Sequence, residues 1–326
     1  MRDNKNILLK RECVIFVLIA AALLAFRAVA YSGQVVKNSF EDNFPHIKGD
    51  YVVWQGNVSG DWEIFLYNIT TRGLSRITDN EYDDVSPQTD GNYVVWLGCN
   101  GSGGEIFLYD ISNKTTVRIT HDNHVDVPPS IARGKIVWTS YEVTDSVEPG
   151  EIYLYDIATG VTTQLTRNSL DDSAPRIHDN KVIWVQRNDQ GAVIVMYDLT
   201  SGESASAPEG FILENNSQID GALMVFTRKV GDDREIFLYN RERYTYQQIT
   251  DNEIEDKSPS LSGNTIAWVR GEGTSAEIFL NNESACIEND FEIERPESLS
   301  PSPLAPPPPS LDKSCFIQSL YFERFF

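Results

Sequence analysis

Six acidic residues recur at one fixed place in this sequence, and their type and spacing could do chemistry. Successive members are 42, 42, 46, 42 and 42 positions apart: Asp42, Asp84, Asp126, Asp172, Glu214 and Asp256. Gathered around one opening, they would attract a cation, calcium being the candidate, or a Lys/Arg-rich segment of a partner. The competing interpretation is structural, because an Asp that accepts backbone N–H bonds stabilises its own turn and a repeated position suits that role.

A second acidic set follows the same period and is expected to form another layer on the same face. Its members open one recurring strand: Glu63, Glu105, Glu151, Glu235 and Glu277. The cysteines and histidines show no metal-binding spacing, so we predict no metal site and leave calcium as an open question.

The period is broken once, where four extra residues lengthen the hairpin 141–150 and bring in Glu142, Asp145 and Glu148. Loops that vary on a rigid scaffold often carry specificity. This hairpin, together with the nearby segment that contains His121, Asp122 and His124, is therefore the second candidate contact patch. The two histidines lack a third ligand in register, which favours solvent-exposed loop residues over a metal site.

Catalytic motifs are missing from the chain. It contains no Gly-x-Ser-x-Gly, no His-Glu-x-x-His and no phosphate-binding glycine loop. Acidic residues could supply a glycosidase pair, but repeated carboxylates give no reason to single out two. We therefore expect a protein that is not an enzyme.

The elements that must position these acids repeat with the same period. Each repeat has an aromatic anchor: Trp54, Trp96, Trp138, Trp184, Phe226 and Trp268. Around each anchor lie short β-branched and aromatic runs separated by Gly/Asn/Asp/Ser turns, which indicates hairpin-linked antiparallel strands. A period of about 40–45 residues fits four-stranded propeller blades. We predict an all-β, six-bladed β-propeller in which the anchors pack between blades.

The ring is predicted to close through its amino-terminal strand. Residues 34–36 resemble an outer strand that has no blade of its own, whereas the last repeat lacks a good copy of that strand. The competing candidate for the vacant place is the segment 291–293. Pairing of either segment would complete the sixth blade.

The two ends differ from the repeats. Residues 1–30 read as a signal peptide, with a basic start, an apolar run at 13–26 and a small-x-small site at 28–30. The propeller is expected over 31–294, and 295–326 as a Pro/Ser-rich linker with a disordered tail. A net charge of −21 argues against nucleic-acid binding. We expect a secreted protein or one of the cell envelope, without a membrane span in its mature chain, and monomeric.

The repeat resembles a known family. The pattern Ile-Val-Trp, Glu-Ile-Tyr-Leu-Tyr-Asp, Thr-Gly, Gln-Leu-Thr, Asp-Asp and Ala-Pro over 136–175 is similar to the TolB-type propeller repeat and to repeats of secreted cell-surface proteins of methanogenic archaea. The resemblance covers about 34–294. It implies a non-catalytic binding or scaffold module of the cell surface, whose partner is a protein or polysaccharide of the envelope. The alternative is an extracellular propeller enzyme that processes glycans or peptides, with acidic residues at its channel mouth.

Overall fold

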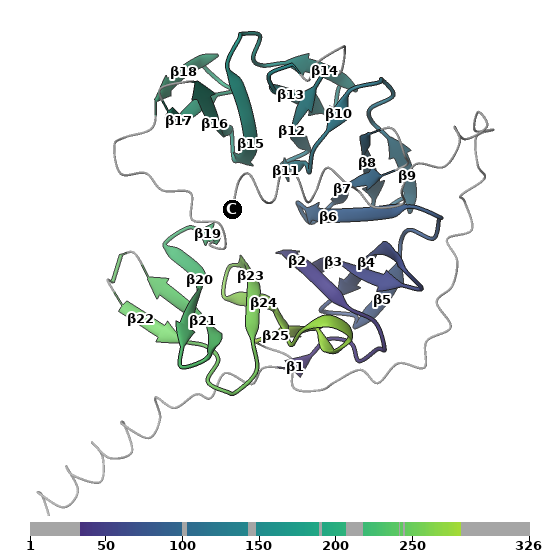
Figure 1. Cartoon of the computed structure of the whole chain (residues 1–326), viewed down its shortest axis with the longest axis vertical. Helices are drawn as coiled ribbons and strands as arrows, with labels where there is room; N and C mark the ends of the chain where they lie inside the picture. The colour runs from purple at the N-terminus through teal and green to yellow at the C-terminus, as the bar shows by residue number, and fades with distance from the viewer. Residues whose placement is uncertain are drawn as a thin grey trace, which may run out of the picture.

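The computed structural model describes residues 33–99, 103–142, 148–188, 191–206, 218–240, 242–243 and 245–281. These residues form six antiparallel sheets arranged in a ring, as Figure 1 shows. The predicted all-β, six-bladed propeller is confirmed. One short 3-10 turn, η1 (Gly273–Ser275), is the helical element of the described part. No helix within the described residues is long and apolar enough to cross a membrane.

Within each blade the strands lie side by side, in order from the centre of the ring to its rim. Blade 1 comprises β2 (Asp42–Lys48), β3 (Tyr51–Val58), β4 (Asp61–Asn68) and β5 (Gly73–Arg76). Blade 2 comprises β6 (Asp83–Thr89), β7 (Tyr93–Cys99), β8 (Gly104–Asp110) and β9 (Thr115–Arg118). Blade 3 comprises β10 (Val125–Asp126), β11 (Ser130–Ala132), β12 (Lys135–Tyr141), β13 (Glu151–Asp156) and β14 (Val161–Gln164).

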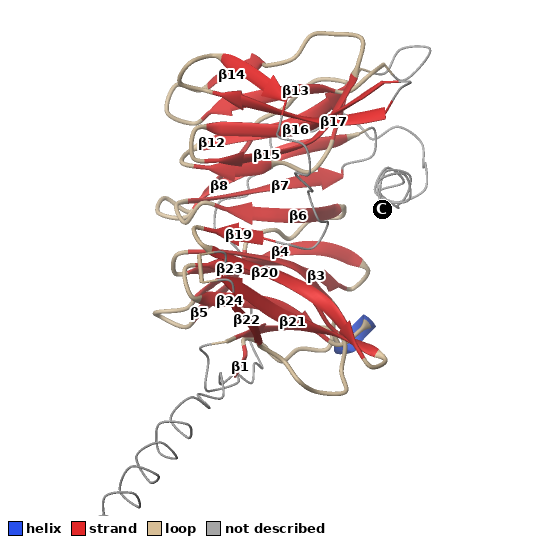
Figure 2. Cartoon of the chain, turned by 90° about the vertical axis from the view of Figure 1, so that its left-hand side faces the viewer, coloured by secondary structure: helices blue, strands red, loops and turns tan. Residues whose placement is uncertain are grey.

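Blades 4 to 6 continue the pattern. Blade 4 comprises β15 (Asp171–His178), β16 (Lys181–Asn188), β17 (Gly191–Asp198) and β18 (Glu203–Ser206). Blade 5 comprises β19 (Gln218–Asp220), β20 (Leu223–Val230), β21 (Asp233–Asn240) and β22 (Thr245–Gln248). Blade 6 comprises β23 (Asp256–Ser262), β24 (Thr265–Arg270), β25 (Glu277–Leu280) and β1 (Gly33–Gln34). In the edge-on view of Figure 2 the strands run across the thickness of the disc, so the connecting loops gather on its two faces.

The innermost strands share one irregularity. In blades 1, 2, 4 and 6 a bulge interrupts pairing with the next strand, and the bulged residue has φ near +50°: Phe44, Ser86, Ala174 and Ser258. A bulge bends a strand and increases its twist, which re-aims the residues that follow it. In blade 3, Pro128 and Pro129 lie at this place, and the strand divides into β10 and β11 because proline cannot donate to the ladder.

The amino-terminal strand closes the ring as predicted. β1 pairs antiparallel with β25, so that Gly33 lies opposite Leu280 and Gln34 opposite Phe279. The N–H of Val35 also donates to the carbonyl of Ile278 at 2.7 Å. The competing segment 291–293 lies outside the described residues. The sixth blade is therefore assembled from both ends of the repeat region.

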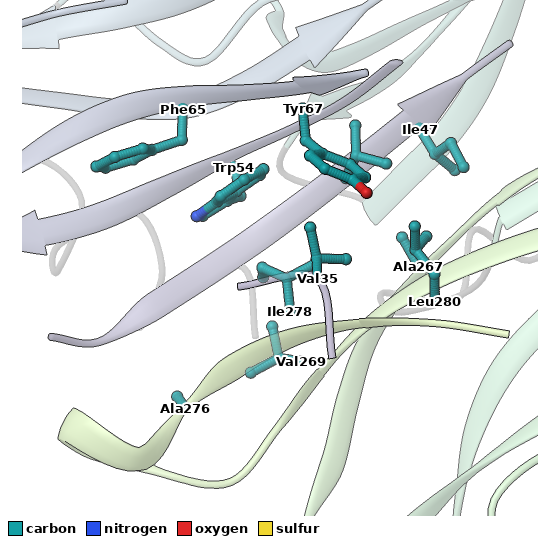
Figure 3. Close-up of a cluster of buried hydrophobic side chains, with 11 residues drawn as sticks. Val35, Ile47, Trp54, Phe65, Tyr67, Ala267, Val269, Ala276, Ile278 and Leu280 are labelled. Carbon is teal, nitrogen blue, oxygen red and sulfur yellow. The ribbon is translucent and has the colours of Figure 1, made fainter. Parts of the chain in front are cut away.

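The cores lie between the blades. At the closure, Val35 packs with residues of blades 6 and 1, including Trp54 and Ile278, and is 1% exposed (Figure 3). Comparable buried clusters fill the junctions 1–2, 2–3, 3–4 and 5–6. The described residues form no such cluster between blades 4 and 5, where Val193 of β17 and Ile219 of β19 are about half exposed. Stacking twisted sheets thus buries apolar surface at five described junctions.

Candidate functional site

The structure encloses the repeated acids in the protein. All five that it describes are 0–1% exposed: Asp42, Asp84, Asp126, Asp172 and Asp256. Each accepts the indole N–H of its own blade's anchor, at 2.9, 2.7, 3.1, 2.8 and 2.8 Å in chain order. A buried indole needs an acceptor, and the carboxylate supplies it.

The same carboxylates also fix the loops that connect the blades. In four cases the second oxygen accepts the side-chain amide of an asparagine four residues earlier: Asn38, Asn80, Asn168 and Asn252. The backbone N–H of that asparagine donates to the glutamate of the preceding blade, for example from Asn80 to Glu63 at 3.1 Å. A chain of hydrogen bonds thus joins the glutamate of one blade to the anchor of the next.

The ring closure uses this same chain of bonds. The N–H of Asn38 donates to Glu277 of blade 6 at 3.1 Å, and its amide donates to Asp42 at 2.9 Å. Trp54 of blade 1 completes the link. The first and last blades are therefore joined by the same link as blades 1 and 2, blades 3 and 4, and blades 5 and 6.

The second acidic set is likewise engaged within the blades. Glu63 and Glu105 pair with Arg76 and Arg118, and the Glu63 pair has an N···O distance of 2.7 Å. Glu151, Glu235 and Glu277 accept the N–H of Asn168, Asn252 and Asn38. These carboxylates support backbone and arginine partners inside the ring.

Burial disfavours the charged form of several of these acids. It raises the pKa of Asp42 and Asp84 well above the usual range, that of Asp126 to about 6 and that of Glu277 to about 7. Two blades add donors to the carboxylate: Gln186 donates to Asp172 at 2.9 Å, and Arg270 pairs with Asp256 at 2.9 Å. In blades 4 and 6 the compensation that a buried acid requires is thus built into the blade itself.

These contacts correct the expectation of an open acidic ring. The five described carboxylates are enclosed and hydrogen-bonded, so they do not line an exposed channel mouth. The sixth, Glu214, lies outside the described residues. Glu214 belongs to the repeat whose anchor is Phe226, and the side chain of Phe226 has no N–H to donate. The sequence therefore held a signal for the pairing, because aspartate accompanies tryptophan in the other five repeats.

The blade with the long hairpin departs from the pattern and contains a cavity of about 540 Å³. Its lining comes from the ends of the hairpin, from β12, β13 and β14, and from both loops that flank the blade: His124, Ser140, Glu142, Glu148, Pro149, Glu151, Tyr153, Gln164, Arg167 and Asn168. Concave sites of this size are typical of small-ligand pockets. We call this the blade 3 cavity.

Substitutions within the repeat make this cavity chemically distinct. Asp122 stands where the other described links carry asparagine, and Arg167 stands where blades 1 and 5 carry Asp79 and Asp251. Arg167 donates to Gln164 at 3.0 Å. Three carboxylates and one guanidinium line the cavity, which leaves it net negative.

The acidic surroundings of the cavity affect one of its lining side chains, Tyr153. The phenol of Tyr153 has a raised pKa, caused first by burial and then by Asp122 and Glu151. Its ring stacks on that of Trp138, with centroids 5.8 Å apart. The cavity thus combines an aromatic wall with negative charge, which is suited to a cationic group.

The second predicted patch is partly brought together here. Glu142, Glu148 and His124 line the cavity, whereas His121 is exposed and Asp145 lies outside the described residues. His124 contacts the hydroxyl of Ser140 at 3.2 Å. Within the described residues, no group of three or more His, Cys, Asp or Glu side chains is arranged to hold a metal ion. Sequence reasoning missed Tyr153 and Arg167, although Arg167 could have been found by comparing the repeats.

Comparison with known proteins supports the fold. No protein-family model and no curated protein matches the chain. An oligogalacturonate lyase from Vibrio parahaemolyticus is similar in structure, with a TM-score of 0.53, 11% identity, and coverage of 76% of this chain and 92% of that one. An oligogalacturonate lyase in complex with manganese has a TM-score of 0.50 and 12% identity, and the match covers 77% of this chain and 89% of that one. TolB from Acinetobacter baumannii has a TM-score of 0.43 and 14% identity, and the match covers 67% of this chain and 59% of that one. At these identities the likeness concerns the fold alone.

Proposed function

We propose that this chain is a secreted, non-catalytic binding module of the cell surface or envelope, and that its blade 3 cavity receives a basic side chain of an envelope protein. The observation that carries the proposal is the net negative lining of a cavity that occurs where the repeat loses its symmetry. A lysine or arginine inserted there would meet the carboxylates of Glu142 and Glu148 and the ring of Tyr153, all of which line the cavity. Such contacts give specificity and favour rapid association.

The engagement of the repeated carboxylates supports a binding role over catalysis. A glycosidase needs two carboxyl groups that face the scissile bond and are free to exchange protons. The described acids of the repeat instead hold indoles, amides or arginines within the blades. The extended scaffold that they stabilise presents loops on two faces, which suits a module that docks another molecule.

The extracellular location rests on the ends and the charge of the chain. The segment 1–30 has the features of a signal peptide, and the net charge of −21 suits an ionic extracellular medium. Acceptor sequons for glycans at Asn57, Asn68 and Asn113 lie in the described blades, and Asn113 is exposed.

A direct test uses the chain from residue 31 onward and a tetralysine peptide as the probe. We expect calorimetric titration to show binding that weakens as salt is raised, because exposed charges are screened. Glu142→Gln combined with Glu148→Gln should weaken binding about tenfold, and Glu203→Gln on exposed β18 is the charge control. Equal affinities of all variants would contradict the role of the cavity.

The same preparation separates binding from catalysis. Incubation with a panel of extracellular glycans and peptides should leave the panel unchanged, and turnover of any member would favour the enzymatic alternative. Repeating the titrations with and without calcium shows whether that cation contributes. A change in affinity when calcium is present would show that calcium contributes to binding at this site.

A further inference from the structure

A ring of side chains surrounds the propeller axis at one position of each innermost strand, eight residues before the anchor. The six are His46, Gln88, Ser130, Arg176, Gln218 and Ser260. Figure 1 shows their strands β2, β6, β11, β15, β19 and β23 around the centre. Ser130 and Ser260 are buried, whereas Arg176 is exposed and His46, Gln88 and Gln218 are partly exposed. We call the solvent-accessible space in front of these last four residues the central channel, and the four residues its lining.

Four members of this ring have a structural task. They accept a backbone N–H from the innermost strand of the next blade: His46 from Thr89 at 3.2 Å, Ser130 from Ile177 at 3.3 Å, Gln218 from Leu261 at 3.2 Å and Ser260 from Ile47 at 3.0 Å. These bonds form a belt that links neighbouring blades. The contact between neighbouring blades therefore favours a hydrogen-bond acceptor at this position.

Arg176 cannot perform that task, because a guanidinium only donates hydrogen bonds. It donates to the carbonyl of Pro175 at 3.2 Å, and no ion pair joins it to a carboxylate among the described residues. Its side chain retains solvent exposure, yet the surrounding protein lowers its pKa by desolvation. Both properties fit a side chain that stands in a narrow, solvent-accessible channel.

His46 offers a second donor from the blade across the ring. Burial, and after it the charges of Arg176 and Lys48, lower its pKa to about 4. The ring is therefore neutral at pH 7, and because Nδ1 accepts the Thr89 N–H, the proton lies on Nε2. Lys48 is already paired with Asp220, at 3.7 Å. Among the residues that the structure describes, Arg176 is thus the cation near the axis that has no carboxylate partner.

We propose that the central channel binds the carboxylate of an organic acid, with Arg176 as the anchoring cation and the Nε2–H of His46 as a second donor. A guanidinium presents parallel N–H groups that match the two oxygens of a carboxylate. The partly exposed amide side chains of Gln88 and Gln218 can contact the rest of the ligand. One cation within a strongly acidic protein favours a monoanion over a phosphate dianion.

This site is separate from the blade 3 cavity, so either can fail without the other. The test is calorimetric titration of the chain from residue 31 with two matched pairs of probes. One pair is N-acetyl-dialanine with a free carboxylate against its carboxamide, and the other is galacturonate against galactose. The preferred acid identifies whether a peptide end or an acidic sugar is the source of the carboxylate.

We expect at least one acid to bind about tenfold or more tightly than its neutral partner. Arg176→Gln should abolish that preference, and Arg176→Lys should retain part of it because the charge remains without the planar fork. Arg133→Gln is the control, since this exposed arginine in the turn between β11 and β12 already pairs with Asp179 at 2.7 Å. Binding of neither acid above its neutral partner, or an unchanged preference in Arg176→Gln, would overturn the proposal.

Nuclear magnetic resonance of the histidines gives a readout that a purely structural arginine would not change. A bound carboxylate should shift the Nε2 resonance of His46 and raise its pKa, while His121 and His178, which are exposed, stay unaffected. In the unliganded Arg176→Gln variant the pKa of His46 should already be higher, because one cause of its depression is removed. A His46 signal that no acid perturbs would contradict the second donor.

Discussion

At the scale of single residues, this protein is organised by a pair: a buried aspartate and the tryptophan whose indole it accepts. The carboxylate is desolvated, which is unfavourable for a charge, but it satisfies an indole N–H that would otherwise be buried without a partner. For four of the five described acids, the asparagine four residues earlier satisfies the second oxygen. Three side chains thus define each of these four junctions, and this is why the acids recur with the period of the fold.

Removal of one such carboxylate should destabilise the ring locally. Asp84→Ala would leave the N–H of Trp96 and the amide of Asn80 without their acceptor, so we expect a loss of about 1–3 kcal/mol in the free energy of unfolding. Urea denaturation followed by tryptophan fluorescence measures it. Glu81→Ala in the same loop is exposed and should change stability little. Equal effects of the two substitutions would show that the pair is not what stabilises the junction.

At the scale of elements, closure of the ring depends on a strand of two residues and the segment that follows it. β1 pairs with β25, Val35 fills the junction between blades 6 and 1, and Asn38 links Glu277 to Asp42. The contacts with blade 6 join residues more than 200 positions apart, so they tie the two ends of the repeat array together. The last blade lacks an outer strand without them.

Deletion of residues 31–40 should therefore lower the melting temperature by several degrees. The physical reason is the loss of the outer strand of blade 6 and of the buried Val35 and Val36. Differential scanning calorimetry checks this, with removal of 295–326 as the control of length. An unchanged melting temperature in the deletion variant would refute the closure.

At the scale of the whole molecule, the ring is not uniformly packed. Five junctions contain described apolar clusters, whereas Val193 and Ile219 beside the junction of blades 4 and 5 remain half exposed. Local opening costs least where few apolar contacts are buried. The ring should therefore open first between these two blades.

Hydrogen exchange followed by mass spectrometry checks this order. We expect amides of β17, β19 and β20 to exchange faster than the matching amides of β8, β6 and β7, because blade 2 is covered by clusters on both sides. Since the strands compared are equivalent in the repeat, blade 2 serves as the internal control. Slower exchange in blades 4 and 5 would contradict the weak junction.

The buried carboxyl groups also give the whole molecule a pH dependence. The pKa of Glu277 rises from 4.5 to about 7 on folding, and that of Asp126 from 3.8 to about 6. Between those values the folded chain binds more protons than the unfolded chain, so stability is highest below this window and falls as the pH rises through it. We expect a higher melting temperature at about pH 5 than at about pH 8.

The variant Glu277→Gln isolates one contribution to that slope. The amide does not titrate, so the difference between the two melting temperatures should shrink. Glu203→Gln, which changes the same charge on exposed β18, should leave the difference unchanged. An identical pH slope in the wild type and both variants would rule out Glu277 as a contributor.

The sequence by itself determined the all-β class and the six blades, and it left two candidate segments for the closing strand. The reason is that hydrophobic alternation, turn residues and a fixed period are local properties that every repeat states again. It also located the acids and the irregular hairpin. What a single sequence could not supply was the direction in which a carboxylate points: the same Asp can face an open channel or an indole.

Only the tertiary structure decided that question, because twist and inter-blade stacking determine which side chains are enclosed. Stacking placed Asp84 against Trp96 and away from a shared opening, which turned an expected acidic ring into five separate junctions. It also placed Arg176 at the channel, although nothing in its local sequence distinguishes it from a surface arginine. Local patterns encode the strands, whereas the environment of each charge arises from contacts between residues far apart in the chain.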